Sequence, residues 1–186
     1  MKNKLTFMLD MDGVCCDWVT SALKTIGKPE LVDKWTPGVK SLTDFTEVSY
    51  HDIWEIIDAK GSEWWRDLKE YPWFWDLYKT LNDNGDVVFC SSPCWEAASL
   101  KGKVEWLQDR FGKSYRDYIL TNRKYYVAKQ NSILVDDNDT QCRNFREYGG
   151  RTILFPQLWN DTAFNEEFQK DRIAYVKSRI NFLENE

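Results

Sequence analysis

The chain has 186 residues, of which 42% are hydrophobic and 30% charged, and its formal net charge is −5. This length suits one globular domain with an inserted unit. Because the basic residues are spread along an acidic chain, no electrostatic footprint for a nucleic-acid polymer is expected. No signal sequence and no apolar run of the ~20 residues that cross a membrane is found, so we expect a cytoplasmic protein without a membrane partner.

The cysteines and the histidine argue against two common kinds of site. Five Cys is an odd number with no Cys-x-x-Cys pair, which indicates reduced thiols and disfavours zinc. His51 is the one histidine, which disfavours a histidine-based catalytic triad. We expect His51 at the surface of a helix.

Five short apolar runs predict strands, and helical patterns separate most of them. The strands are expected at residues 5–9, 86–90, 118–121, 132–135 and 152–155. Helices are expected at residues 17–26, 73–81, 97–111, 138–148 and 163–183. Strands that alternate with helices predict an α/β fold, a Rossmann-like doubly wound parallel sheet.

The region between the first two strands does not fit this alternation. Residues 29–71 are irregular, with a loop at Asp44 and Phe45 and a helix at residues 50–59. We expect residues 18–70 to form a small helical cap inserted after the first strand. Residues 1–17 and 71–186 would then form the catalytic core.

Polar side chains follow three of the predicted strands. They are Asp10 and Asp12 after the first strand, Ser91 and Ser92 after the second, and Asp136 and Asp137 after the fourth, with Lys124 shortly before the fourth. The carboxyl ends of parallel strands share one edge of a sheet, so these groups are expected to converge. Two carboxylates as close as Asp10 and Asp12 require either a cation between them or a shared proton. Both solutions predict chemistry, as a divalent metal site or as a nucleophile beside an acid.

Each of these signals also has a purely structural explanation. Asp and Gly are ordinary turn residues, and Ser91-Ser92-Pro93 fits a strand that exits into a turn. Asp136 and Asp137 fit the N-cap of a helix. Lys129 competes with Lys124 as the lysine that contacts phosphate.

Four segments resemble the haloacid dehalogenase superfamily of phosphatases, and more closely its 5'(3')-deoxyribonucleotidase family. They are Asp-Met-Asp-Gly-Val at 10–14, Phe-Cys-Ser-Ser-Pro at 89–93, Ile-Leu-Thr-Asn-Arg-Lys at 119–124 and Leu-Val-Asp-Asp at 134–137. The resemblance extends from residue 5 to about residue 160. It favours Lys124 over Lys129 for the phosphate.

The resemblance implies a role for each residue. Asp10 is the expected nucleophile, and Asp12 the acid that protonates the leaving oxygen and later the base for water. Mg²⁺ is the expected cofactor, held by Asp10, the backbone carbonyl of Asp12, and Asp136, with Asp137 outside this ligand set. Ser91 and Lys124 are expected to hold the phosphoryl oxygens.

The expected substrate is a nucleoside 5'-monophosphate, and a deoxyribonucleoside monophosphate is preferred among these. Trp18 and Phe45 are candidates for stacking on its base, and Ser92, Asn122 and Arg123 for further substrate contacts. The sequence departs from the family here, because Asn122 stands where the family has Arg. Three alternatives stay open, namely another small phosphomonoester such as a sugar phosphate, a nucleic-acid 3'-phosphate, and an inactive binding protein. A homodimer is also left open.

Overall fold

A five-stranded parallel sheet forms the centre of the structure, a computed structural model that describes residues 4–184. Over this range the strand order is β3-β2-β1-β4-β5. The strands are β1 (Thr6–Leu9), β2 (Asp86–Ser91), β3 (Tyr118–Leu120), β4 (Ser132–Asp136) and β5 (Arg151–Leu154). The five predicted strands and the Rossmann-like α/β class are therefore confirmed.

The register of the sheet decides which strand ends meet. Leu9 of β1 pairs with Val135 of β4, and the Asp10 N–H donates to the Val135 carbonyl at 2.9 Å. Asp10 and Asp136 therefore stand side by side at the end of their strands. On the other side of β1, Leu9 pairs with Phe89, which brings the end of β2 to the same edge.

Alternate side chains of each strand point to opposite faces of the sheet, and both faces are buried. Phe7 and Leu9 of β1 belong to the larger core cluster, whereas Met8 packs in a smaller cluster with Leu134 and Phe145. All five cysteines are free thiols, in agreement with the sequence analysis.

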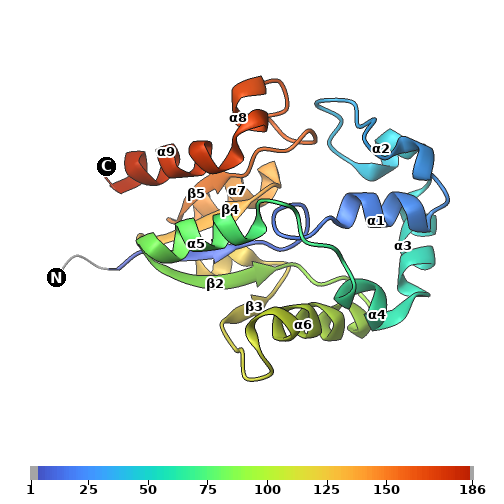
Figure 1. Cartoon of the computed structure of the whole chain (residues 1–186), viewed down its shortest axis with the longest axis horizontal. Helices are drawn as coiled ribbons and strands as arrows, with labels where there is room; N and C mark the ends of the chain where they lie inside the picture. Colours follow the sequence, from blue (N-terminus) through green and yellow to red (C-terminus); the bar gives the residue numbers. More distant parts are fainter. Residues whose placement is uncertain (1–3, 185–186) are drawn as a thin grey trace.

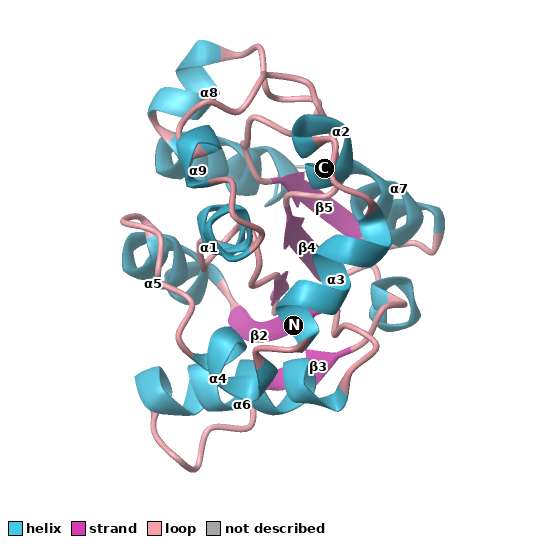
Figure 2. Cartoon of the chain, turned by 90° about the vertical axis from the view of Figure 1, so that its right-hand side faces the viewer, coloured by secondary structure: helices cyan, strands magenta, loops and turns pink. Residues whose placement is uncertain are grey.

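Helices surround the sheet, as Figure 2 shows. Helices α5 and α9 contact each other and cover one face, and α7 packs against β4 and β5 on the other. The helices, in chain order, are α1 (Trp18–Thr25), η1 (Pro29–Leu31), α2 (Leu42–Thr46), α3 (Tyr50–Asp58), α4 (Gly61–Arg66), α5 (Phe74–Asn84), α6 (Ala97–Phe111), η2 (Lys124–Val127), α7 (Asp139–Glu147), α8 (Glu166–Lys170) and α9 (Arg172–Glu184).

Helices α1 to α4 lie beyond the carboxyl ends of the strands, to the right of the sheet in Figure 1. They come between β1 and β2 in the chain, as expected for an inserted cap. The division into a cap at residues 18–70 and a core elsewhere stays a prediction. Helix α4 packs on α6, so the predicted cap region also contacts the rest of the molecule away from the chain connections.

Three parts of the secondary structure were predicted wrongly. Helix α4 was not predicted, because its residues lie in the region that was described as irregular. The loop expected at Asp44 and Phe45 is helix α2, which begins because the Ser41 hydroxyl accepts a hydrogen bond from the Asp44 N–H at 3.0 Å. The single helix expected at residues 163–183 is two helices. Asp171 ends α8 and its carboxylate accepts from the Ala174 N–H at 2.9 Å, so the same residue caps the start of α9.

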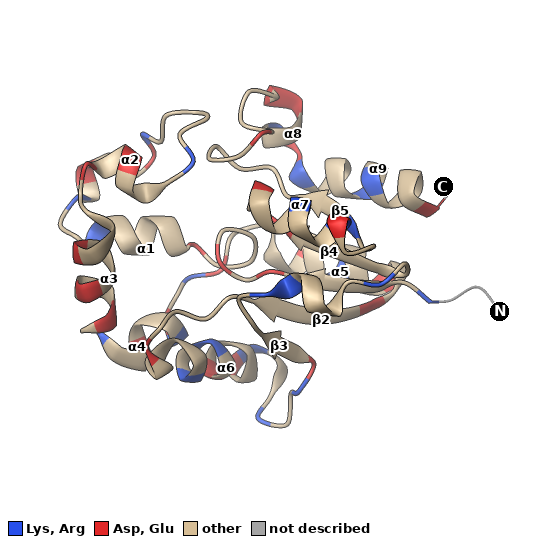
Figure 3. Ribbon diagram, turned by 180° about the vertical axis from the view of Figure 1, so that it is seen from behind, with Lys and Arg blue, Asp and Glu red and all other residues tan. Residues whose placement is uncertain are grey.

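The C-terminal packing follows from this break. Val176, Ile180 and Leu183 of α9 are buried, whereas Phe164 lies before α8 and is 79% exposed. Over residues 4–184, no helix combines the length and the apolar character needed to cross a membrane. Basic and acidic side chains are distributed over many separate elements (Figure 3).

Candidate active site

Asp10 follows β1 directly and is only 7% exposed. The turn after it is held together by the Met11 carbonyl, which accepts from the N–H groups of Cys15 at 2.7 Å and Cys16 at 3.0 Å. Gly13 in this turn has φ of +78°, and a Cβ there would collide with the Asp137 carboxylate. The Asp-x-Asp-Gly sequence therefore supplies both the acids and the one residue type that fits beside them.

Lys124, at the start of η2, lies between two of the acids. Its ammonium group is 2.7 Å from Asp10 Oδ1 and 2.7 Å from Asp136 Oδ2, and the side chain is buried. Burial alone would lower the pKa of Lys124, but the charges of Asp10 and Asp136 outweigh it and raise that pKa. The lysine is therefore a fixed cation. Lys129 is exposed in the turn before β4.

Asp136 ends β4 and is fully buried. One carboxylate oxygen accepts from the Asn138 N–H at 2.9 Å, and the other accepts from Lys124. Burial raises the pKa of Asp136 to about 6, against the lowering effect of Lys124. Both oxygens of this carboxylate therefore already have donors.

The carboxylate of Asp137 has a different hydrogen-bond donor from that of Asp136. Its Oδ2 accepts from the indole N–H of Trp159 at 2.5 Å. Burial, followed by the charges of Asp136 and Asp10, raises its pKa. No donor within residues 4–184 reaches Oδ1 of this carboxylate, so that oxygen is free to bind a cation.

The three aspartates form a cluster that fits a hard divalent cation. Asp10, Asp136 and Asp137 each offer a carboxylate oxygen, and these oxygens lie within 4.8 Å of one another. Carboxylates are the ligands that Mg²⁺ prefers, and three of them against the single ammonium of Lys124 leave excess negative charge. The donor set therefore agrees with the expected Mg²⁺, and it includes Asp137, which the sequence analysis placed outside the ligand set.

Lys103 of α6 is a site residue that the sequence analysis missed. It is buried, its ammonium group donates to Asp12 Oδ2, and it also donates to the Ser91 hydroxyl at 3.0 Å. The ammonium also lies 5.0 Å from the ring centre of Trp65. A lysine four residues before Leu107, on the apolar face of a predicted helix, is the signal that could have revealed it.

A pocket of about 720 Å³ opens in front of the aspartates, and residues of α1 and α3 line it together with residues at the strand ends. Trp18, Ser92 and Asn122 are in its wall, as expected of substrate-binding residues.

Within the described part of the chain, Phe45 and Arg123 are not lining residues. Phe45 stacks behind Trp35 at 4.5 Å, whereas exposed Arg123 donates to the Tyr126 hydroxyl at 2.8 Å. The wall also contains aromatic residues that were not predicted, namely Trp35, Tyr50, Trp54, Trp95 and Trp159.

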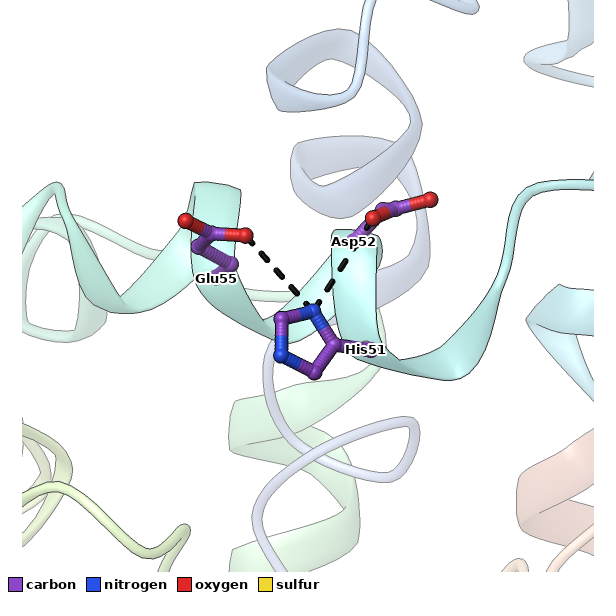
Figure 4. Close-up of side chains that lie close together, drawn as sticks. All are labelled: His51, Asp52 and Glu55. Carbon is purple, nitrogen blue, oxygen red and sulfur yellow. Dashed lines mark ion pairs between the residues drawn. The ribbon is translucent and has the colours of Figure 1, made fainter.

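A second group of potential metal ligands lies on α3 (Figure 4). The His51 ring nitrogen is 3.6 Å from Glu55 and 3.9 Å from Asp52, and all three side chains are exposed. Such groups arise on a helix surface from sequence spacing alone. His51 therefore occupies the surface helix position that was predicted.

Several solved structures share this fold. The haloacid dehalogenase-like hydrolase SP0104 from Streptococcus pneumoniae is 13% identical, with a TM-score of 0.58 over 96% of this chain and 99% of that one. A haloacid dehalogenase-like protein from Burkholderia xenovorans is 13% identical, with a TM-score of 0.56 over 97% and 98%. A variant of CbbY from Rhodobacter sphaeroides, in complex with xylulose-(1,5)bisphosphate, is 12% identical, with a TM-score of 0.52 over 87% and 92%. The fold is that of the haloacid dehalogenase-like hydrolases.

The match to a sequence family identifies a smaller group within the haloacid dehalogenase-like hydrolases. The family described as 5' nucleotidase, deoxy (pyrimidine), cytosolic type C protein (NT5C) matches residues 3–177. The chain belongs to this family and is a phosphatase of the haloacid dehalogenase superfamily, a phosphoric monoester hydrolase. No curated protein matches the chain in sequence.

Proposed function

We propose that the protein hydrolyses (deoxy)ribonucleoside 5'-monophosphates in a Mg²⁺-dependent reaction that passes through an aspartyl-phosphate. The observation that carries the proposal is the meeting of the aspartates and Lys124 at the base of a pocket with aromatic walls. The acids and the lysine suit phosphoryl transfer, and the aromatic rings suit a planar base. Membership in a deoxynucleotidase family supports the same substrate class.

In the first half of the reaction, an Asp10 carboxylate oxygen attacks phosphorus while the bond from phosphorus to the sugar oxygen breaks. Bound Mg²⁺ would offset the repulsion between this carboxylate and the phosphate. Lys124 adjoins Asp10 and would contact a phosphoryl oxygen. Asp12 gives its proton to the leaving sugar oxygen, which releases the nucleoside.

In the second half, Asp12 takes a proton from water as that water attacks phosphorus. The bond between phosphorus and Asp10 breaks, which restores the carboxylate and releases inorganic phosphate. Ser91 is fully buried just behind the pocket wall formed by Ser92, and its oxygen accepts from Lys103. Its own hydrogen would then donate to a phosphoryl oxygen in both halves.

Phosphate release from a panel of substrates tests this function. The panel contains deoxyribonucleoside and ribonucleoside 5'-monophosphates, sugar phosphates and an oligonucleotide with a 3'-phosphate, each with Mg²⁺ and with EDTA. We expect metal-dependent release from the nucleotides. Release confined to sugar phosphates would keep the mechanism and overturn the substrate, whereas no release from any compound would favour a binding protein.

The variant Asp10→Asn tests the nucleophile in the same assay. It keeps the size of the side chain but removes the attacking carboxylate, so we expect turnover to fall below detection. Asp83→Asn is the matched control, because Asp83 is an exposed aspartate of α5 that pairs with Lys79. Substantial activity in the first variant would exclude Asp10 as the nucleophile.

A further inference from the structure

Residues 156–162, which follow β5 and are called here the β5 loop, hold Asp137 at two points. The Trp159 indole N–H donates to the Asp137 carboxylate at 2.5 Å, and the Asn160 side-chain amide donates to the Asp137 carbonyl at 2.8 Å. The backbone and the carboxylate of Asp137 are thus both fixed by neighbours in one short segment. Such hydrogen bonds orient a ligand before a metal binds.

The Trp159 ring is itself held in place by the cap. Trp35 contacts it edge-on with 5.4 Å between ring centres, and Trp35 is backed by Phe45 at 4.5 Å. The backbone in this region is also joined, because the Gly38 N–H donates to the Leu158 carbonyl at 2.8 Å. The ring is therefore held by Trp35 and by the backbone bond of the neighbouring Leu158, while its indole N–H donates to Asp137.

The ion pairs of Lys40 strengthen the same junction. Its ammonium group lies 2.6 Å from Asp161 of the β5 loop and 2.9 Å from Asp139 at the start of α7. Lys40 belongs to the segment that leads into α2, so the cap and the β5 loop are joined by charge as well as by rings. Exposed ion pairs contribute little energy each, and the aromatic contact is the stronger restraint.

The hydrogen bond from Trp159 affects how the Asp137 carboxylate can bind a metal. The Trp159 hydrogen bond is the side-chain contact that fixes Oδ2 of this carboxylate, and a carboxylate oxygen of Asp137 lies within 4.8 Å of oxygens of Asp10 and Asp136. A carboxylate that lost the indole N–H could rotate about its Cβ–Cγ bond. Its oxygen would then reach the metal only part of the time.

We propose that Trp159 is a positioning residue for the metal site, since its indole N–H fixes the Asp137 carboxylate while its ring is held by Trp35 of the cap. This inference rests on the Mg²⁺-dependent function proposed above. It assigns Trp159 no contact with the reacting atoms. Its effect on the metal site passes through Asp137, and this effect is separate from its place in the pocket wall.

The test compares Mg²⁺ binding by wild type and Trp159→Phe, measured by titration calorimetry on the substrate-free protein. Phenylalanine keeps an aromatic ring against Trp35 and removes the N–H. We expect the Kd for Mg²⁺ to rise about 10-fold, the lower end of the range for partners of metal ligands. Trp64→Phe is the matched control, because it removes an indole N–H that donates to Thr25 at 2.8 Å within the cap, and its Kd should not change.

Steady-state kinetics supply a second readout that a general structural defect would not give. If Trp159 acts only on the metal site, kcat of Trp159→Phe should return to the wild-type value when Mg²⁺ is raised above the new Kd. An unchanged Kd, or a kcat that excess Mg²⁺ does not restore, would overturn the inference and leave the proposed function intact. A wild type that binds no Mg²⁺ would overturn both.

Discussion

The ammonium group of Lys103 touches Asp12 and Ser91 at once, and this contact joins two residues of the proposed site. Burial lowers the pKa of Lys103, but Asp12 outweighs that effect and raises it, so the lysine stays charged. Lys103 thus holds the Asp12 carboxylate in one direction and occupies one lone pair of the Ser91 hydroxyl, whose hydrogen must point elsewhere.

Lys103→Met should lower kcat about 100-fold, because methionine has similar length but leaves Asp12 without its partner. The effect should be smaller for p-nitrophenyl phosphate, whose leaving group needs no proton. Lys101→Met is the control, since Lys101 is an exposed lysine of the same helix, with its side chain 67% exposed. A Lys103→Met enzyme with kcat within about twofold of wild type would rule out this role.

The buried aspartates also predict how Mg²⁺ binding depends on pH. Burial raises the pKa of Asp136 to about 6 in the metal-free protein, and it raises that of Asp137 as well. Protons compete with the metal for these carboxylates. A single group with this pKa makes the Kd for Mg²⁺ about 10-fold weaker at pH 5 than at pH 7.5, which calorimetry at the two pH values would measure.

The same shift fixes the sign of the pH dependence of stability. An unfolded aspartate has a pKa near 3.9, so between about pH 4 and 6 the folded metal-free protein binds the extra proton. Its stability should therefore fall as the pH rises through 6. A metal-free protein whose Tm rises over that interval would contradict the raised pKa of Asp136.

At the scale of elements, the junction of α4 and α6 depends on one glycine. A Cβ on Gly102 of α6 would collide with the Ser62 carbonyl and with the Trp65 side chain of α4. These two helices join the cap region to the core, and Lys103 is the next residue of α6. The close approach therefore helps to direct the lysine toward the site.

Gly102→Ala should destabilise the protein although alanine favours helices by about 1 kcal/mol. Overpacking of this kind costs about 1–3 kcal/mol, which corresponds to a loss of roughly 2–12 °C in Tm at this chain length. Lys101→Ala, on the exposed face of the same helix, should leave Tm nearly unchanged. An unchanged Tm in Gly102→Ala would show that α4 moves freely away from α6.

Short-range patterns decided how well the elements could be predicted from the sequence. The five strands were found because each is a short apolar run, and buried parallel strands have that composition. The break between α8 and α9 was missed because Asp171 is also compatible with a helix interior. Its capping bond to the Ala174 N–H becomes visible only in the structure.

At the scale of the whole molecule, the site combines residues that are distant in sequence. The acids were predictable, because a parallel sheet must bring its strand ends to one edge, and the family resemblance favoured Lys124 over Lys129. Lys103 and Trp159 were not, since Lys103 meets Asp12 across 91 positions and Trp159 meets Asp137 across 22. Such contacts depend on how helix α6 and the β5 loop pack, and no local motif encodes that packing.

The cluster of buried carboxylates makes the stability of the whole protein depend on metal. Asp10, Asp136 and Asp137 lie together with Lys124 as their close cation, so the folded state should bind Mg²⁺ and the unfolded chain should not. Mg²⁺ at 100 times its Kd stabilises such a protein by about 2.7 kcal/mol. For a chain of this size, Tm should rise by about 5–11 °C.

Thermal unfolding with Mg²⁺ and with EDTA measures this shift, and two variants locate it. Asp137→Asn removes a charge and a ligand from the cluster, so most of the Mg²⁺-dependent rise should disappear. The exposed control Asp83→Asn should keep the full rise, since Asp83 lies on α5 and pairs with Lys79. Equal shifts in both variants would place the stabilising metal outside the aspartate cluster, and the role of these carboxylates in Mg²⁺ binding would then have to be abandoned.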